Sequence, residues 1–298
     1  MQNTDFKIAR STLIINEREL IDDDIKILAK AKNLTKLYCK NCDIKPETLN
    51  NLLKNLPKSI KEISFIDNEF SIQEARILAK FIPNKSISLL NLTWNFIAAA
   101  GMQALSAVLP SMKKLASLNI AGNCIEDAGF QSLLDVLPDM KSLTSLDVSA
   151  NSIGIVQAKK LAKLLPKINL TKLEISQNEI SFTGIECVIK NLSLTTLKCL
   201  IIDNNIINKY DEEKILDIVK ADNCCITNIY GLQNSETINA LVKSNKKGLT
   251  NQSNEAILNL IQYHKFPPPL AHLVKDYVTI NNNNSKSQGR ATKKIRLF

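Results

Sequence analysis

An eleven-residue pattern recurs seven times in this chain and constrains its fold more than any other feature. Apolar residues occupy its first, fourth, sixth and eleventh places, and asparagine holds the ninth place in six of the seven copies. Successive copies begin 26, 27, 28, 28, 27 and 27 residues apart, and a period of this length predicts an array of stacked units. Copies 1 to 7 are LTKLYCKNCDI (34–44), IKEISFIDNEF (60–70), ISLLNLTWNFI (87–97), LASLNIAGNCI (115–125), LTSLDVSANSI (143–153), LTKLEISQNEI (170–180) and LKCLIIDNNII (197–207).

Proline marks the same period independently of the asparagine. It closes amphipathic stretches such as QALSAVLP and AKKLAKLLP, at Pro57, Pro83, Pro110, Pro138 and Pro166. Each copy therefore predicts a short strand, with its fourth and sixth places turned inward, followed by a helix that ends near the proline. One such unit cannot bury its apolar face alone, so neighbouring units stack with their strands in parallel.

The pattern LxxLxLxxNxI resembles the leucine-rich repeat, and the long period with a helix in each copy resembles the ribonuclease-inhibitor type. The resemblance covers residues 8 to 244, where IARSTLIIN (8–16) fits an N-terminal half-repeat and ITNIYGLQN (226–234) a degenerate last copy. It implies an α/β solenoid, or horseshoe, with a parallel concave sheet and outer helices. The expected organisation is an N-terminal cap or half-repeat (1–33), the repeats (34–244), a helical C-terminal cap (245–280) and a disordered basic tail (281–298).

Composition excludes several classes of function. The formal net charge is +9, but five of the positive charges lie in residues 281–298, which contain no acid. The repeats therefore lack the basic face of a nucleic-acid binder. The N-terminus has no secretory signal, and no run of about 18 apolar residues could span a bilayer. Seven cysteines without a disulfide-type spacing fit a reducing compartment, so we expect a cytoplasmic protein.

The residues that catalysis or metal binding would need are missing from the repeats. The only two histidines, His264 and His272, follow them, and no phosphate loop or hydrolase motif occurs. Cys39 and Cys42 form a CxxC, but they hold the sixth and ninth places of copy 1, which are core and asparagine positions. We therefore expect no enzyme activity, no metal site and no cofactor.

The outward places of the strands are the candidate binding surface, because function on a solenoid lies on its exposed concave side. Small polar residues occupy the middle copies, acids run through the C-terminal half, and apolar groups flank them. These features predict a protein partner with a basic patch and apolar neighbours. The candidate partner-binding residues are Tyr38, Lys40, Ile66, Leu89, Asn91, Trp94, Asn119, Asp147, Glu174, Ile201, Asp203 and Tyr230.

Trp94, the only tryptophan of the chain, holds the eighth place of copy 3, where copies 4 and 5 carry Gly122 and Ala150. One interpretation is an exposed anchor for a partner, since interface tryptophans often contribute most of the binding energy. The other is that the indole folds over the turn and packs on Phe96 or on a neighbouring copy. The sequence leaves both open.

The segment after residue 243 loses the period. The spacing of six residues resembles the opening of an F-box, which docks ubiquitin-ligase adaptors on their ligase core: Phe266, Pro267, Leu270, Val274, Tyr277 and Val278. The segment 255–278 therefore offers two interpretations, a cap on the last repeat or an adaptor element. The pattern departs from an F-box because Phe266 replaces leucine and the segment follows the repeats.

The low-complexity tail NNNNSKSQGRATKKIRLF resembles the export signals of type IV-secreted bacterial effectors. Together with the repeats it makes the chain similar to leucine-rich-repeat effectors of the Legionella type, delivered into a host cytosol. The expected function is non-catalytic binding of a protein partner, a host protein or a companion effector, which the repeats inhibit or mask. The competing expectation is a ubiquitin-ligase adaptor.

Overall fold

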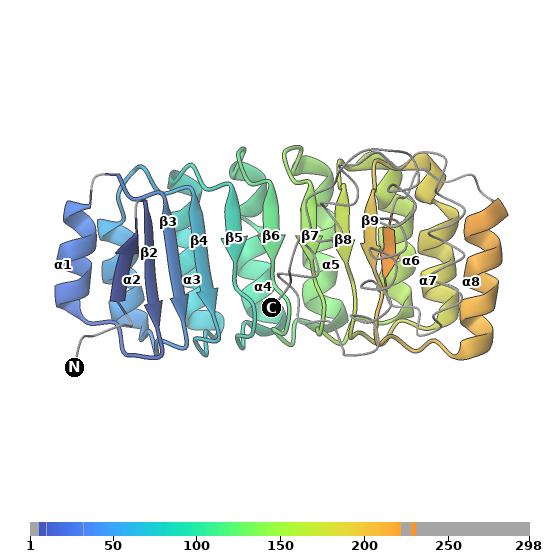
Figure 1. Cartoon of the computed structure of the whole chain (residues 1–298), viewed down its shortest axis with the longest axis horizontal. Helices are drawn as coiled ribbons and strands as arrows, with labels where there is room; N and C mark the ends of the chain where they lie inside the picture. Colours follow the sequence, from blue (N-terminus) through green and yellow to red (C-terminus); the bar gives the residue numbers. More distant parts are fainter. Residues whose placement is uncertain (1–5, 10, 32, 222–227, 231–298) are drawn as a thin grey trace, which may run out of the picture. The chain divides into compact units, whose positions relative to one another are not determined.

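Ten strands form a single sheet in which the spatial order follows the chain order (Figure 1). Eight parallel pairings join β2 through β10 in sequence, and β1 pairs antiparallel with β2. The strands are β1 Phe6–Ala9, β2 Thr12–Asn16, β3 Lys36–Lys40, β4 Glu62–Ile66, β5 Leu89–Asn91, β6 Ser117–Asn119, β7 Ser145–Asp147, β8 Lys172–Glu174, β9 Cys199–Ile201 and β10 Asn228–Tyr230.

The computed structural model describes residues 6–9, 11–31, 33–221 and 228–230. The chain divides into two units, Met1–Leu232 and Gln233–Phe298. The expected cap at 245–280, the F-box-like segment and the tail lie outside the described residues, as does the expected end of the repeats at residue 244.

One helix follows each strand from β2 to β9, and α2 to α7 lie together on one side of the sheet (Figure 1). Among the described residues no helix lies on the opposite side, which we call the open face. The helices are α1 Asp22–Lys30, α2 Pro46–Asn55, α3 Ile72–Phe81, α4 Ala98–Ser106, α5 Glu126–Val136, α6 Ile155–Leu164, α7 Phe182–Lys190 and α8 Lys209–Ala221.

The inward places of the repeat build the core. The fourth-place residues stack in register from strand to strand, so that Leu118 pairs with Leu90 on one side and with Leu146 on the other. All seven fourth-place and all seven sixth-place side chains are buried, as the repeat predicts. Because each copy buries its leucines against its two neighbours, the stability of the array rests on nearest-neighbour packing.

The prolines stop the helices. Four of them stand second in a three-residue 3₁₀ turn, at Pro83, Pro110, Pro138 and Pro166. The turn follows α3, α5 and α6 directly and comes two residues after the end of α4. Proline has no N–H to continue the helical pattern, and its fixed φ suits the first positions of a turn. The expected helix ends are therefore confirmed, and the fold is an α/β solenoid of leucine-rich repeats.

The ninth-place asparagines connect the turns of successive copies. The Oδ1 atom of Asn151 accepts from the backbone N–H groups of Asn123 and Ile125 in the preceding copy, at 3.0 and 3.3 Å. Its Nδ2 donates to three carbonyls, those of Ile120, Val148 and Ser149. Asn95 and Asn178 make equivalent bonds, so the amides satisfy backbone groups that the turns bury.

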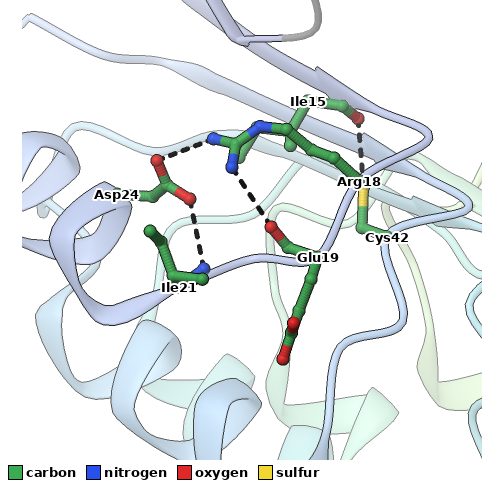
Figure 2. A network of polar contacts seen from close by, with 6 residues as sticks. All are labelled: Ile15, Arg18, Glu19, Ile21, Asp24 and Cys42. Carbon is green, nitrogen blue, oxygen red and sulfur yellow. Dashed lines mark hydrogen bonds and ion pairs between the residues drawn. The ribbon is translucent and has the colours of Figure 1, made fainter.

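Copy 1 ends this series with a cysteine and an ion pair. The Cys42 thiol donates to the carbonyl of Ile15 at 3.2 Å, where an asparagine would have used its amide (Figure 2). The backbone N–H of Cys42 still donates to Oδ1 of Asn68. Beside it Arg18 bonds Asp24 at 2.7 Å, and Asp24 also accepts from the N–H of Ile21 at the start of α1. This network closes the N-terminal end of the repeats.

The eighth place has an unusual backbone in every copy. Its φ is positive throughout, between 51° and 64°. Asparagine, aspartate and glycine tolerate this left-handed region, whereas a bulky residue there is an outlier. Trp94, with φ 55°, is the bulkiest residue at this place.

We expect Asn151→Ala to lower the melting temperature by about 6–12 °C, because truncation leaves buried N–H and C=O groups unpaired at a cost of roughly 3 kcal/mol. Thermal unfolding followed by circular dichroism measures this. Asn169→Ala is the matched control, since the Asn169 side chain is exposed and makes one hydrogen bond, to the carbonyl of Lys141. Equal losses in both variants would contradict the role assigned to Asn151.

Candidate protein-binding surface

The sheet register brings most of the candidate binding residues onto one row. The fifth-place residues pair directly across neighbouring strands, from Tyr38 through Asn91, Asn119, Asp147, Glu174 and Ile201 to Tyr230. Three further candidates lie on strands at the N-terminal end of this row: Lys40 on β3, Ile66 on β4 and Leu89 on β5. Trp94 and Asp203 follow the ends of β5 and β9. The side chain of Tyr230 is outside the described part of the molecule.

The outward side chains of the open face are more crowded than the sequence suggests. Tyr38, Ile66 and Leu89 are partly exposed, but Ile201 retains only 8% exposure. The sequence predicts that Ile201 extends into solvent, and the structure shows that it does not. Neighbouring strands lie about 4.8 Å apart, so side chains in one row cover each other. Its role in partner binding stays a prediction.

Three polar residues of this row are held by the turns that follow them. Oδ1 of Asn91 accepts from the N–H and the hydroxyl of Thr93, and Oδ1 of Asp147 does the same with Ser149. Asn119 accepts from the N–H of Ala121 and donates to Asp147 at 2.8 Å. These are Asx turns. Their sequence signal is an Asn or Asp two residues before the bonded N–H, and the turns could have been predicted from it.

The acids of the C-terminal half lie in a partly dehydrated environment. Burial raises the pKa of the Glu174 carboxyl, and the neighbouring Asp147 carboxylate adds to this shift. Lys172 opposes it, with its Nζ 3.3 Å from Oε2 of Glu174. Burial also raises the pKa of Asp203. A cationic group brought by a partner would relieve this cost, so the two carboxylates suit basic side chains.

We expect Glu174→Gln to raise the melting temperature at pH 7. The folded pKa of Glu174 lies above its ordinary value of 4.5, so the stability of the folded state falls as pH rises from that value through the folded pKa. The uncharged amide removes this loss, and the gain should disappear near pH 4. Thermal unfolding between pH 4 and pH 8 measures it.

Glu62→Gln is the control for Glu174→Gln, because it removes a carboxylate from the same face that is paired with Lys36 at 3.0 Å. It should give no gain at pH 7. A lower melting temperature of Glu174→Gln at pH 7 would mean that the ion pair with Lys172 outweighs burial.

Trp94 combines features of both interpretations of its role. Its side chain keeps 56% of its surface exposed. The indole also lies over Gly122 of copy 4, because a Cβ atom built on Gly122 would come within 2.8 Å of Cδ2 and closer still to Cε3. The ring thus packs on the neighbouring copy, and Gly122 provides the room for it.

The hydrogen bonds of the turns also change at this place. The N–H of Asn95 donates to the carbonyl of Gly122, not to Oδ1 of Asn123. That oxygen is fully buried and has no partner among the described residues. The usual asparagine connection is therefore incomplete beneath the tryptophan.

We expect Gly122→Ala to displace the Trp94 indole from its contact with residue 122. Its fluorescence should shift to longer wavelength because the displaced ring is more exposed to water. The added methyl group also sits at φ 64°, which costs roughly 1–2 kcal/mol. Because Trp94 is the only tryptophan, emission reports on this site alone. Ala150→Gly, at the same place of the next copy, should leave the spectrum unchanged. An unchanged spectrum of Gly122→Ala would contradict the packing described.

Within the described ranges, no group of three or more His, Cys, Asp or Glu side chains could hold a metal ion. Cys39 and Cys42 are both buried in the core of copy 1. Cys199 lies half-buried at the start of β9, and burial raises its pKa to about 11, so its thiol stays protonated at neutral pH. His264 and His272 lie outside the described residues. No helix of the part that is described combines the length and the apolar character needed to cross a membrane.

Comparison with known families supports the repeat. The family described as "Leucine Rich repeat" matches residues 111–134, which contain β6 and most of α5. The matched residues span about one unit of the solenoid, so the family model agrees with the architecture there. No curated protein matches it at a significant level. Among solved structures, one titled "Leiomodin-1 Actin-Binding Site 2 (ABS2)" has 15% sequence identity and a TM-score of 0.37, covering 65% of this chain and 98% of its own. Similarity this low supports no conclusion about function.

Proposed function

We propose that this protein is a non-catalytic scaffold that binds a protein partner through the open face of its sheet. The observation that supports this best is the in-register row of fifth-place residues, which crosses eight strands without a helix over it among the described residues. Parallel stacking turns one variable place per copy into a continuous surface. The row spans eight strands that lie about 4.8 Å apart, a length that suits a macromolecule. Among the described residues no group of three or more His, Cys, Asp or Glu side chains could hold a metal ion.

The two halves of the row suit different parts of a partner. Tyr38, Ile66 and Leu89 supply partly exposed apolar area in the N-terminal half, whereas Asp147, Glu174 and Asp203 supply negative charge in the other. Aromatic and aliphatic anchors provide most of the affinity in such interfaces, and charges set orientation and association rate. The partner therefore presents an apolar patch beside basic side chains, and the same carboxylates repel nucleic-acid phosphates.

The action on the partner is steric masking. The resemblance to the ribonuclease-inhibitor type supports covering another protein's functional surface, and the resemblance to type IV effectors supports a host protein or a companion effector as the target. Both are proposals from sequence resemblance, as is a location in the cytoplasm. The adaptor alternative rests on the F-box-like spacing at 255–278, outside the described residues.

We expect Ser117→Arg to weaken partner binding at least tenfold, because it places a long side chain in the middle of the open face. Ser117 is partly exposed on β6 between Leu89 and Ser145. Affinity capture with wild-type and variant protein, followed by mass spectrometry and titration of the captured partner, measures this. Ser193→Arg, in the exposed turn after α7, is the matched control and should bind normally.

Equal capture by Ser117→Arg and by wild type would contradict binding at the open face. Ligase-core components captured by the full chain but not by a 1–250 truncation would instead favour the adaptor alternative.

A further inference from the structure

The loops that lead from β4, β5 and β6 into their helices form a second surface, separate from the open face. We call the residues Asp67–Ser71, Trp94–Ala98 and Gly122–Glu126 the strand-to-helix edge. These loops are neighbours because their strands are adjacent in the sheet (Figure 1). Backbone bonds from Asp67 to Thr93 and from Trp94 to Ala121 hold the loops together at 3.0 and 2.8 Å.

The tenth place of the repeat points into solvent in all seven copies. In copy 3 this place holds Phe96, with 62% of its side chain exposed, two residues after the half-exposed Trp94. Asn95 and Ile97, which alternate with them, are buried. The exposure of the two rings therefore follows from the repeat geometry. Neither ring is buried enough for the core to explain it, and adjacent exposed aromatics indicate a contact surface.

The charge around these rings is one-sided. The loops and first helical turns of copies 2 to 4 (67–75, 94–101 and 122–129) contain five acids and no lysine or arginine. The chain as a whole has 38 basic and 29 acidic residues, so the edge departs from the composition of the protein. A locally acidic, aromatic surface on a basic protein is suited to a cationic partner.

Two of the five acids already have structural roles. Glu74 closes the capping box of α3 with Ser71, and Asp127 accepts from the N–H of Gly154 at 2.7 Å. The remaining three, Asp67, Glu69 and Glu126, are exposed, and within the described part of the chain their carboxylates accept no hydrogen bond and form no ion pair. The charge of Glu69 does reach Lys45 of copy 1, whose pKa it helps to raise. These three carboxylates flank Trp94 and Phe96 on both sides.

Stability does not account for the aromatic residues. Trp94 adopts a left-handed backbone that costs a bulky residue roughly 1–2 kcal/mol. The buried oxygen of Asn123 lacks a partner directly beside this loop. A left-handed eighth place occurs in every copy, so what sets copy 3 apart is the bulk of its side chain and the unpartnered amide oxygen of Asn123.

We propose that the strand-to-helix edge binds a basic amphipathic segment of a partner protein, whose apolar residues cover Trp94 and Phe96 and whose lysines or arginines meet Asp67, Glu69 and Glu126. The inference rests on the proposed protein-binding function and adds a second binding surface, which is separate from the open face. An anionic membrane or a nucleic acid is a poorer occupant, because the three carboxylates would repel its phosphates.

The test uses the full-length protein and an 18-residue peptide of lysine and leucine with one leucine face and no tryptophan. The emission of Trp94 at increasing peptide concentration gives the affinity of the wild-type protein. For the variants, the affinity is measured from the fluorescence of a dye attached to the peptide. We expect a shift of Trp94 emission to shorter wavelength, with binding that weakens at high salt. The same peptide with glutamate in place of lysine should bind at least tenfold more weakly.

Phe96→Ser should weaken binding of the basic peptide at least tenfold without unfolding the protein. Ile206→Ser is the matched control: it makes the same kind of change at the tenth place of copy 7, where the side chain is 61% exposed, and should bind normally. Glu69→Gln combined with Glu126→Gln should reduce both the affinity and its dependence on salt.

Several results would overturn the proposal. Equal binding by Phe96→Ser and wild type would move the peptide elsewhere, and loss of binding in Ser117→Arg but not in Phe96→Ser would move it to the open face. A dimer that Phe96→Ser converts to monomer would make a second copy the occupant. Binding to phosphatidylserine vesicles that Phe96→Ser abolishes would make it a lipid surface. Failure of the edge variants alone leaves the open-face proposal intact, since Ser117→Arg tests that separately.

Discussion

The hydrogen bonds of the ninth-place asparagines are the interaction on which the rest of the structure depends. A primary amide can accept from the turn before it and donate to its own turn and the strand behind it, as Asn151 does. No shorter or charged side chain offers both functions at that distance. By fixing each turn against the previous one, the amide also fixes the left-handed eighth place and the exposed tenth place. The asparagine recurs in six of the seven copies, whereas the eighth place and the exposed tenth place hold different residues from copy to copy.

The period made the architecture and the core predictable, since a leucine at the fourth place can only be buried when copies stack. The asparagine bonds have the same origin, because a turn buried between copies needs partners for its backbone. The Asx turns at Asn91 and Asp147 were not predicted, although their sequence signal is present, because a repeat pattern describes what copies share and not what single copies add. Exposure on the open face was overestimated at Ile201, which keeps only 8% exposure because its neighbours in the row cover it, whereas Ile66 and Leu89 stay partly exposed.

The position of Trp94 could not be derived from its own copy. The indole occupies the space that a side chain at Gly122, 28 residues later, would fill. Such a contact between two copies depends on their register in three dimensions. The two interpretations offered by the sequence therefore prove compatible, because one face of the indole rests on the next copy while the rest of it stays in solvent. A partly seated ring loses less conformational entropy on binding than a free one, which makes it a better anchor than full exposure would.

The open face and the strand-to-helix edge differ in how their charges are held. On the open face Asp147 is fixed by hydrogen bonds and Glu174 is partly buried beside Lys172, so these carboxylates can orient a partner without rearranging. On the edge Asp67, Glu69 and Glu126 are exposed, and their attraction acts through solvent and is screened by salt. Each copy touches only its neighbours, so strain around Trp94 stays within copies 3 and 4 and does not disturb the row on the sheet. A solenoid can therefore place a bulky residue in a left-handed turn at its edge without disturbing the hydrogen-bonded row on its sheet.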